Sequence, residues 1–476
     1  MLDTFKRFVA SYGYDATDDR GRRKPAPSTT YAEDEHADRR KRTILSASAR
    51  DMARNFAIAA WAIRKHLDYV SDFTFQAKTD DAGFNVELES YMASAMRPMR
   101  FDAAQRHNFR RAVRIAEACA VKDGDINWLK IAPPAPSFLR GTVQAIEGDR
   151  IQIPQSDIPE NSDKESWVNG VRIGPNGESA AYAICKRDGS QMKLERIVSA
   201  RSMITRGFYD RYDQVRGISP IASGLNWFKD TYEGFEYSIA KLKVGQLFGL
   251  QVFRNADDAL MGAGTAYAET DADGDGQADA GYAVDFNRGP FMLDMEPGDK
   301  AEILESRTPS TETVDFLKLM VHVALKALDI PYSFFDESFT NFYGSRGGLI
   351  QYLKSCTSKI ADLQEFQDSW AIWRLGLAVA DGDVTLPSGR DFNWLNWEFV
   401  PAGVPWWDPV KEVNGNRLAV ASGFTSPQRV CREVGTDFET NIRERAEAER
   451  IATDAGVTLD FGIVAPQQVE VTNADE

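Results

Sequence analysis

The sequence is poor in the residues from which metal and redox sites are usually built. Among 476 residues there are four cysteines and four histidines. No two cysteines are closely spaced, which excludes a CxxC metal or redox site and favours reduced thiols over disulfides. No histidine lies at ligand spacing from another histidine or from a cysteine. These residues are Cys119, Cys185, Cys356, Cys431, His36, His66, His107 and His322.

The signature motifs of several enzyme classes are also missing. The chain has no GxxxxGK[ST] phosphate loop, and it has no HExxH zinc motif. Ser345 does not sit in a GxSxG elbow, because Tyr343 takes the place of the first glycine. Pairs of carboxylates carry no information, since the chain has 71 acidic residues. We therefore expect no enzymatic activity.

Long apolar runs and an excess of positive charge are absent as well. No stretch of about 18 apolar residues is present, so we expect no membrane-spanning segment, and the charged first ten residues are unlike a signal peptide. The formal net charge is −15. This charge argues against tight, sequence-reading DNA binding, which needs a basic surface. It does not argue against a surface along which DNA slides, because repulsion keeps phosphates from sticking.

The chain is long enough for several parts around a sizeable core. Residues 1–44 are expected to form a flexible arm, and residues 459–476 a disordered polar tail. The arm ends in the basic run Arg39-Arg40-Lys41-Arg42, which is either solvated or grips a partner or nucleic acid.

Residues 45–218 combine helical and β patterns. Apolar spacing predicts helices over residues 46–70 and 103–118, the second with an exposed basic face. Short β pieces separated by turn formers follow over residues 126–210, with Asn169-Gly170 and Pro175-Asn176-Gly177 as predicted turns.

Three long helices are predicted in the second half of the chain. The helix 219–248, whose apolar seam from Ile221 to Leu242 is roughly 33 Å long, has Ser219 as expected cap and Pro220 in its first turn. Its apolar residues follow a heptad seam, which must pack lengthwise against helices of the same chain or of another. The seam residues are Ile221, Leu225, Phe228, Tyr232, Phe235, Ile239 and Leu242. The other two helices are expected over residues 311–329 and 345–379.

A loop rich in glycine and aromatic residues precedes the third helix, over residues 336–348. Gly347 and Gly348 lie directly before the predicted helix and would permit backbone movement there. A static connector is the alternative.

The C-terminal part is expected to be a small helical bundle. Asp408-Pro409 and Ser426-Pro427 are predicted helix starts, and Gly435 is a predicted helix stop. Thr436 and Glu439 have the spacing of a capping box.

An acidic loop is the one candidate metal site. Asp271, Asp273, Asp275 and Asp279 follow a DxDxDGxxD pattern, in which Gly276 supplies the sharp turn of an EF-hand-like loop. Position twelve is Tyr282 and not a glutamate. The loop either binds calcium or is simply a solvated acidic loop.

Six short strings, in order, resemble the lambda-like family of phage portal proteins, over most of the chain after residue 45. They are Arg50-Asp51 with Arg54-Asn55; Asn169-Gly170-Val171 with Gly177 and Tyr182; Gln214-Val215-Arg216-Gly217 before Ser219-Pro220; Met295-Glu296-Pro297-Gly298 with Pro309-Ser310 and Ile330-Pro331-Tyr332; Asn341-Phe342-Tyr343-Gly344-Ser345-Arg346; and Trp407-Asp408-Pro409-Val410-Lys411-Glu412 with Gly435 and Asp437. The fifth departs from the family's Asn-Tyr-Ser-Ser-x-Arg, and the acidic loop is not a family hallmark.

The resemblance implies an α+β portal fold. In that fold, residues 45–218 and 331–400 form a wing, and helices 219–249 and 310–330 form a stem. Residues 250–309 form a small β-containing clip, and residues 401–458 form an α-helical crown. The loop 336–348 would be a tunnel loop facing DNA through Asn341, Phe342, Tyr343, Ser345 and Arg346, with the long helix 345–379 behind it. Arg346 either contacts phosphate or braces the loop through a carboxylate of the chain.

The function that the resemblance implies is a dodecameric ring at one vertex of a capsid. The ring would be the channel for genome packaging and ejection, with no required cofactor. Its expected partners are double-stranded DNA, the terminase large subunit, the major capsid protein and a head-completion or adaptor protein. The expected location is the virion, and the host cytoplasm during assembly. The alternatives are another self-assembling head-tail adaptor or capsid protein, and an acidic hydrolase with calcium in the Asp271 loop.

Overall fold

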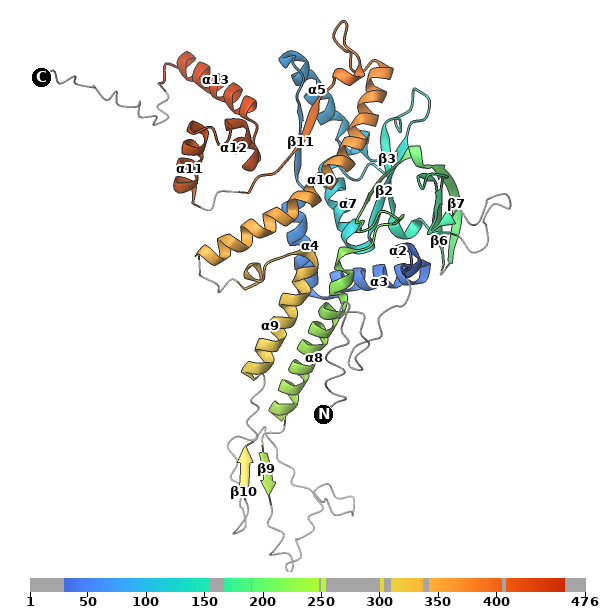
Figure 1. Cartoon of the computed structure of the whole chain (residues 1–476), viewed down its shortest axis with the longest axis vertical. Coiled ribbons are helices and arrows are strands. Elements are labelled where there is room, and N and C mark those ends of the chain that lie inside the picture. Colours follow the sequence, from blue (N-terminus) through green and yellow to red (C-terminus); the bar gives the residue numbers. More distant parts are fainter. Residues whose placement is uncertain are drawn as a thin grey trace, which may run out of the picture. The chain divides into compact units, whose positions relative to one another are not determined.

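The computed structural model describes residues 30–153, 167–189, 191–247, 250–253, 300–303, 310–336, 342–404 and 408–458 (Figure 1). The chain divides into two compact units. Unit 1 comprises residues 1–228 and 322–476, and unit 2 comprises residues 229–321. No described helix is both long and apolar enough to cross a bilayer.

Helices open the described part of unit 1. They are α2 (Glu33–His36), α3 (Arg39–Asn55), α4 (Ala57–Val70), α5 (Ala82–Ala95), α6 (Pro98–Phe101) and α7 (Phe109–Asp123). The single helix predicted over residues 46–70 is two helices, because Phe56 is extended, with φ −114° and ψ 112°. Its buried ring packs edge-on against Phe228, at a centroid distance of 6.3 Å. The helix predicted over residues 103–118 is α7, which starts six residues later.

The predicted flexible arm ends too late in the sequence. Within it, Glu33–His36 and the residues from Arg39 onward are helical, and Asp34 is buried. The Asp34 carboxylate accepts hydrogen bonds from the Val215 backbone N–H (2.6 Å) and from Asn169 Nδ2 (3.2 Å). These contacts to residues far along the chain order the segment that its composition marks as loose.

The predicted β region forms two antiparallel sheets. One has the order β3-β2-β8 and the other the order β4-β5-β6-β7. In the first, Trp128 pairs with Ala145 and with Ile204. The strands are β2 (Asp125–Ile131), β3 (Thr142–Glu147), β4 (Trp167–Val168), β5 (Val171–Ile173), β6 (Ser179–Asp188), β7 (Gln191–Ser199) and β8 (Met203–Gly207). Two further pairs are β1 (Phe73–Ala77) with β11 (Trp397–Pro401), and β9 (Leu250–Phe253) with β10 (Lys300–Ile303) in unit 2.

An aromatic cluster forms the centre of unit 1. The ring centroids of Trp370 and Phe109 lie 4.4 Å apart and those of Trp128 and Phe366 4.3 Å apart, each pair with tilted ring planes. Phe101 and both tryptophans are at most 1% exposed. Such rings contribute large buried areas and favourable edge and offset contacts. The cluster therefore holds α7, β2 and the long helix α10 together.

The three predicted long helices are present with shifted ends. They are α8 (Leu225–Leu247), α9 (Thr311–Leu325) and α10 (Phe342–Asp381), after which Gly382 adopts φ +77°. A 3-10 turn, Pro220–Gly224, precedes α8, and Ser219 does not cap it. The Ser219 hydroxyl instead donates to the Val121 carbonyl at 2.6 Å, because burial gives it that acceptor.

The C-terminal helices are α11 (Pro409–Ala421), α12 (Pro427–Glu433) and α13 (Phe438–Asp454). Asp408 and Ser426 cap the first two as predicted, and Gly435 follows α12 with φ +75°. The predicted capping box at Thr436 is wrong. Asp437 is the N-cap of α13 and accepts from the Thr440 N–H at 3.1 Å.

Candidate functional site

Two of the strings that are distant in the sequence meet at the starts of α10 and α11. Arg346 Nη2 lies 3.1 Å from Glu412 Oε1, and Glu412 is the more buried partner. Asp408 accepts from the Lys411 N–H at 3.3 Å and thereby fixes the first turn of α11, which presents Glu412. Arg346 was expected either to contact phosphate or to brace the loop through a carboxylate of the chain. In the structure it contacts such a carboxylate, that of Glu412. The tryptophans at 406 and 407 lie outside the described residues.

The predicted loop 336–348 is helical from Phe342 onward, so Gly347 and Gly348 lie inside α10. A Cβ at Gly348 would lie 3.1 Å from Ser333 Oγ and 3.4 Å from Pro331 Cβ. This glycine therefore serves close packing and not backbone movement. Gly347 has open space around it.

Of the predicted loop residues, Asn341 lies outside the described residues, as do the side chains of Phe342 and Tyr343. Ser345 lies in the first turn of α10, next to Arg346.

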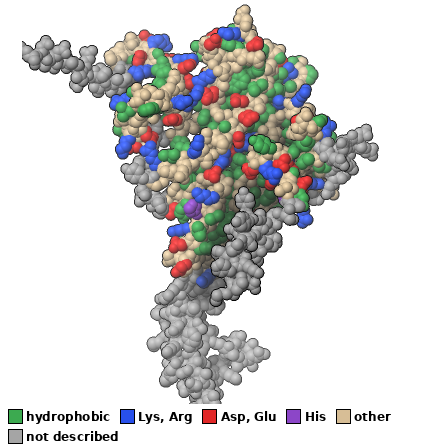
Figure 2. Space-filling view, viewed as in Figure 1, with side chains coloured by type: hydrophobic (Ala, Val, Ile, Leu, Met, Phe, Trp, Pro, Cys, Tyr) green, Lys and Arg blue, Asp and Glu red, His purple; other side chains and the backbone are tan. Residues whose placement is uncertain are grey.

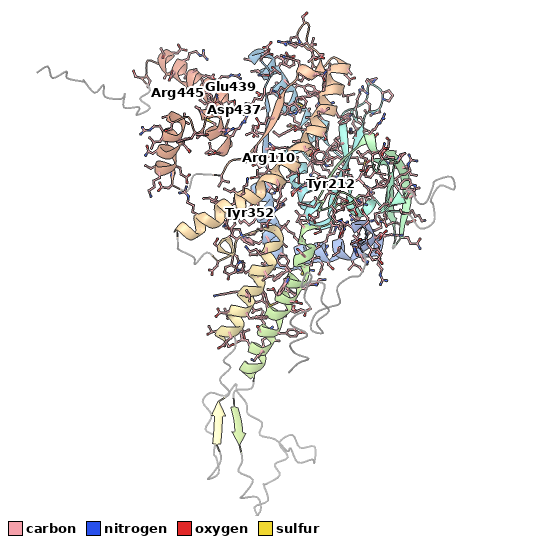
Figure 3. The ribbon with its side chains drawn as sticks, viewed as in Figure 1. Arg110, Tyr212, Tyr352, Asp437, Glu439 and Arg445 are labelled. Carbon is pink, nitrogen blue, oxygen red and sulfur yellow. The ribbon has the colours of Figure 1, made fainter. Side chains whose placement is uncertain are left out.

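The turns of α10 that follow are fixed by aromatic packing. Tyr352 is 1% exposed and contacts Tyr69 of α4 edge-on at 5.1 Å (Figure 3). It also meets Phe334 at 5.4 Å. Burial raises the pKa of the Tyr352 phenol, which therefore stays neutral. The start of α10 rests on a rigid base.

In unit 2, α8 and α9 approach each other closely. A Cβ at Gly234 would lie 2.8 Å from Leu317 Cδ2. Both helices carry exposed apolar side chains, namely Phe235, Tyr237 and Ile239 on α8 and Phe316 and Leu319 on α9. The seam residues at the start of α8 are buried, whereas Phe235 is 36% and Ile239 is 51% exposed. The second half of the seam thus faces solvent in the described chain.

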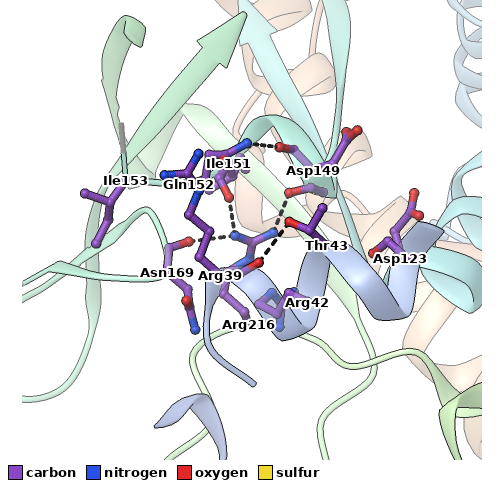
Figure 4. Close-up of a pocket in the computed structure, with 12 residues that line it drawn as sticks. Arg39, Arg42, Thr43, Asp123, Asp149, Ile151, Gln152, Ile153, Asn169 and Arg216 are labelled. Atoms are coloured by element: carbon purple, nitrogen blue, oxygen red, sulfur yellow. Dashed lines mark hydrogen bonds between the residues drawn. The ribbon is translucent and has the colours of Figure 1, made fainter. Parts of the chain in front are cut away.

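Arg216 is the centre of a buried junction that joins three other strings (Figure 4). Its Nε and Nη2 donate to the two oxygens of Asp125, at 2.6 and 2.7 Å. Its remaining N–H groups donate to the carbonyls of Ile151, Asn169 and Gly148 at 2.6–2.8 Å. All five donors of the guanidinium are therefore used.

The charges at this junction are balanced by neighbours. Burial would raise the pKa of Asp125, but the charges and hydrogen bonds of Arg216 and Arg42 hold it below its usual value. Arg50 binds Asp123 at 2.7 Å and also Glu147 and Asp149. The strings around Arg50, Asn169 and Arg216 therefore act in folding and not in chemistry.

Sequence reasoning missed Asp125, which has 1% exposed side chain. It also missed the buried group His66–Glu117–Arg206, in which Glu117 lies 2.9 Å from His66 and 3.2 Å from Arg206. The available signal was weak, since it consists of single charged residues inside apolar stretches. Such residues are buried only when paired.

Surface charge is mixed where it can be seen. On the face shown in Figure 2, acidic and basic side chains are interspersed. The predicted basic face of α7 is partly neutralised, because Arg110 and Arg114 pair with Asp72 and Asp68.

The predicted calcium ligands Asp271, Asp273, Asp275 and Asp279 lie outside the described residues. Within the described ranges, no group of three or more His, Cys, Asp or Glu residues is arranged to hold a metal ion.

The comparison with solved structures matches chains of gene transfer agent particles and a phage portal protein. In the neck of an empty gene transfer agent particle, a chain of 13% identity matches with a TM-score of 0.49, over 82% of this chain and 93% of that one. In the virion of a native gene transfer agent, a chain of 13% identity matches with a TM-score of 0.49, over 83% of this chain and 98% of that one. An HK97 family phage portal protein from Corynebacterium diphtheriae has 10% identity and a TM-score of 0.31, over 76% of this chain and 96% of that one. No curated protein matches the chain in sequence.

The family described as phage portal protein, lambda family, matches residues 20–358. This range is more than half of the chain and includes the junction at Arg216, both helices of unit 2 and Arg346. Portal proteins are structural, non-enzymatic components of the head. The chain belongs to the lambda family of phage portal proteins.

Proposed function

We propose that this portal protein assembles into a dodecameric ring at one capsid vertex, through which the genome is packaged and ejected. The observation that carries the ring is the seam of α8. Its apolar residues continue past the part that the chain itself buries, and Ile239 is left 51% exposed on a helix that belongs to the family match. Exposed apolar faces of this kind are typical of protein interfaces.

The parts of the chain are assigned to portal regions in this proposal. Residues 45–218 and 331–400 are the wing, α8 and α9 are the stem, residues 250–309 the clip and residues 401–458 the crown. Since α10 starts at Phe342, only residues 336–341 of the proposed tunnel loop precede the helix.

The partners follow from these assignments. The clip docks the terminase large subunit during packaging and a head-completion or adaptor protein afterwards. The ring contacts the major capsid protein and is assembled in the host cytoplasm before it becomes part of the virion.

The mechanism in this proposal is passive guidance of double-stranded DNA, without sequence reading. Twelve copies at −15 each carry roughly −180 in total, a repulsive field that lowers the affinity for phosphate. Residues Asn341, Phe342, Tyr343 and Ser345 face the DNA. The ion pair with Glu412 favours a bracing role for Arg346.

Native mass measurement of the purified chain, combined with negative-stain imaging, tests the proposal. The expected species has the mass of twelve copies of the 53.1 kDa chain and shows a closed ring with an axial channel. A stable monomer in all conditions, including with its capsid partners, would refute the ring. Shells or small solid discs would favour a capsid component or an adaptor instead.

A further inference from the structure

A small cavity lies between one face of α3 and the β region of unit 1 (Figure 4). Its volume is about 60 Å³, several times the roughly 10–15 Å³ that one ordered water needs. The α3 side is formed by Arg39, Arg42, Thr43 and Ser46, which have the i, i+3, i+4, i+7 spacing of one helix face. The opposite side includes Gln152 and Asn169.

Most polar groups around the cavity already have partners. Arg216 uses all its donors on Asp125 and three carbonyls, and the amide nitrogens of Gln152 and Asn169 donate to backbone and side-chain oxygens. The Thr43 hydroxyl donates to the Arg39 carbonyl at 2.9 Å. These groups shape the cavity, and most of their donors are used within the chain.

Three groups on α3 do retain donors. Arg42 uses only Nη2, on the Gly217 carbonyl (2.8 Å) and on Asp125 at 3.4 Å. Its Nε and Nη1 contact no acceptor among the described residues. The same holds, within those ranges, for the guanidinium of Arg39 and the hydroxyl of Ser46. The free donors therefore lie on one side of the cavity, at helical spacing.

The cavity is surrounded by carboxylates that the chain's own groups already engage: Asp125 binds Arg216 and Arg42, and Asp34 also acts on the charge of Arg42. Asp123 and Asp149 line it, but both are bound to Arg50 at 2.7 and 3.1 Å. Burial first, and then the neighbouring Arg216, lower the pKa of Arg42 to about 10. A guanidinium whose charged form is disfavoured in this way gains stability from a further anion.

We propose that this cavity binds a small oxyanion of the size and charge of inorganic phosphate, held by Arg39, Arg42 and Ser46. Guanidinium groups match the oxygens of phosphate with two parallel hydrogen bonds, which a halide cannot accept. The anion links α3 to the β region and accepts from the donors of Arg39, Arg42 and Ser46 that the described chain leaves unused. Asp123 and Asp149 repel it, so it lies toward the Arg39 and Ser46 end of the cavity.

Calorimetric titration of the full chain with sodium phosphate tests the site, with thermal unfolding in phosphate and in sodium chloride of equal ionic strength. Saturable binding and a higher Tm in phosphate are expected. Arg39→Gln should weaken phosphate binding at least tenfold, because it removes charged hydrogen bonds. Ser46→Ala should weaken phosphate binding severalfold. Because this variant removes only one hydroxyl, it tests the site even if Arg39→Gln does not fold.

Arg40→Gln is the matched control. Arg40 is exposed on the same turn of α3 and does not line the cavity, so binding should be unchanged. Equal weakening by Arg39→Gln and Arg40→Gln, or equal Tm shifts in phosphate and chloride, would overturn the proposal, since both indicate general screening. A larger Tm shift with a DNA duplex of equal phosphate content would also overturn it, because the duplex backbone does not fit the cavity. None of these outcomes depends on ring assembly.

Discussion

At the scale of single residues, the short sequence strings that resemble the family contain residues that stabilise the fold. Arg216 and Asp125 are both nearly fully buried, at 4% and 1% side-chain exposure. A buried ion pair adds little net stability when its desolvation is counted, but removing one partner leaves an uncompensated charge. Hence these two positions tolerate loss of a partner poorly.

Replacing Arg216 with methionine is therefore expected to lower the free energy of unfolding by about 3–5 kcal/mol. The variant loses the hydrogen bonds to three carbonyls, and it leaves the buried charge of Asp125 without Arg216. Urea unfolding followed by circular dichroism measures it.

Arg211→Met is the control, because Arg211 is 48% exposed and pairs with the equally exposed Asp213. A change of less than about 1 kcal/mol is expected there. Similar losses for both variants would contradict the role given to the junction.

At the scale of elements, the C-terminal helices depend on contacts outside themselves. Within their described residues, α11 and α12 bury no side chain and α13 buries only Ala452. The segment is held by Lys78, which lies 2.5 Å from Asp437, and by Arg432, which lies 2.8 Å from Glu398. Helices as short as these are only marginally stable on their own. The stability of the C-terminal segment therefore depends on such links.

Asp437→Asn keeps the helix cap but removes the ion pair to Lys78. We expect amides of α12 and α13 to exchange about fivefold faster, as about 1 kcal/mol of local stability is lost. Hydrogen exchange measures this, with the α7 amides as internal reference. Glu439→Gln, in the same turn (Figure 3), is the control, because Glu439 is exposed and makes only a long pair with Arg443.

The same contact predicts a pH dependence. Burial would raise the pKa of Asp437, but the hydrogen bonds from Lys78 and Thr440 hold it below its usual value. A carboxyl whose folded pKa is depressed contributes stability fully above its unfolded pKa, about 4. That stability is lost as the pH falls through the lowered value. Protection of the α13 amides, measured relative to the exchange rate of an unfolded chain at the same pH, should therefore fall. Protection that stayed unchanged to pH 2 would contradict the assignment.

At the scale of the whole molecule, the exposed seam of α8 predicts an assembly contact. Ile239→Asp puts a charge on this seam and should abolish the ring while leaving the circular dichroism of the chain unchanged, since Ile239 is already half exposed. Native mass measurement distinguishes monomer from ring. Lys241→Asp places the same charge on an exposed position of the same helix. If both variants assemble equally well, the seam is not the contact.

Local patterns in the sequence predicted where most of the helices lie, some of their ends, and the family. The seam of α8, the cap at Asp408 and the stop at Gly435 depend on residues a few positions apart, so spacing alone reveals them. The six strings likewise predict the family from their order.

Only the tertiary structure decided which of these residues meet. Arg216 binds Asp125 from 91 positions away, Arg346 pairs with Glu412, and Phe56 divides one predicted helix into two. Gly348, inside α10, packs against the turn at Pro331 and Ser333. The physical reason is the same in each case: burial and pairing of charges depend on contacts between distant segments, and a local pattern of residue types does not contain them.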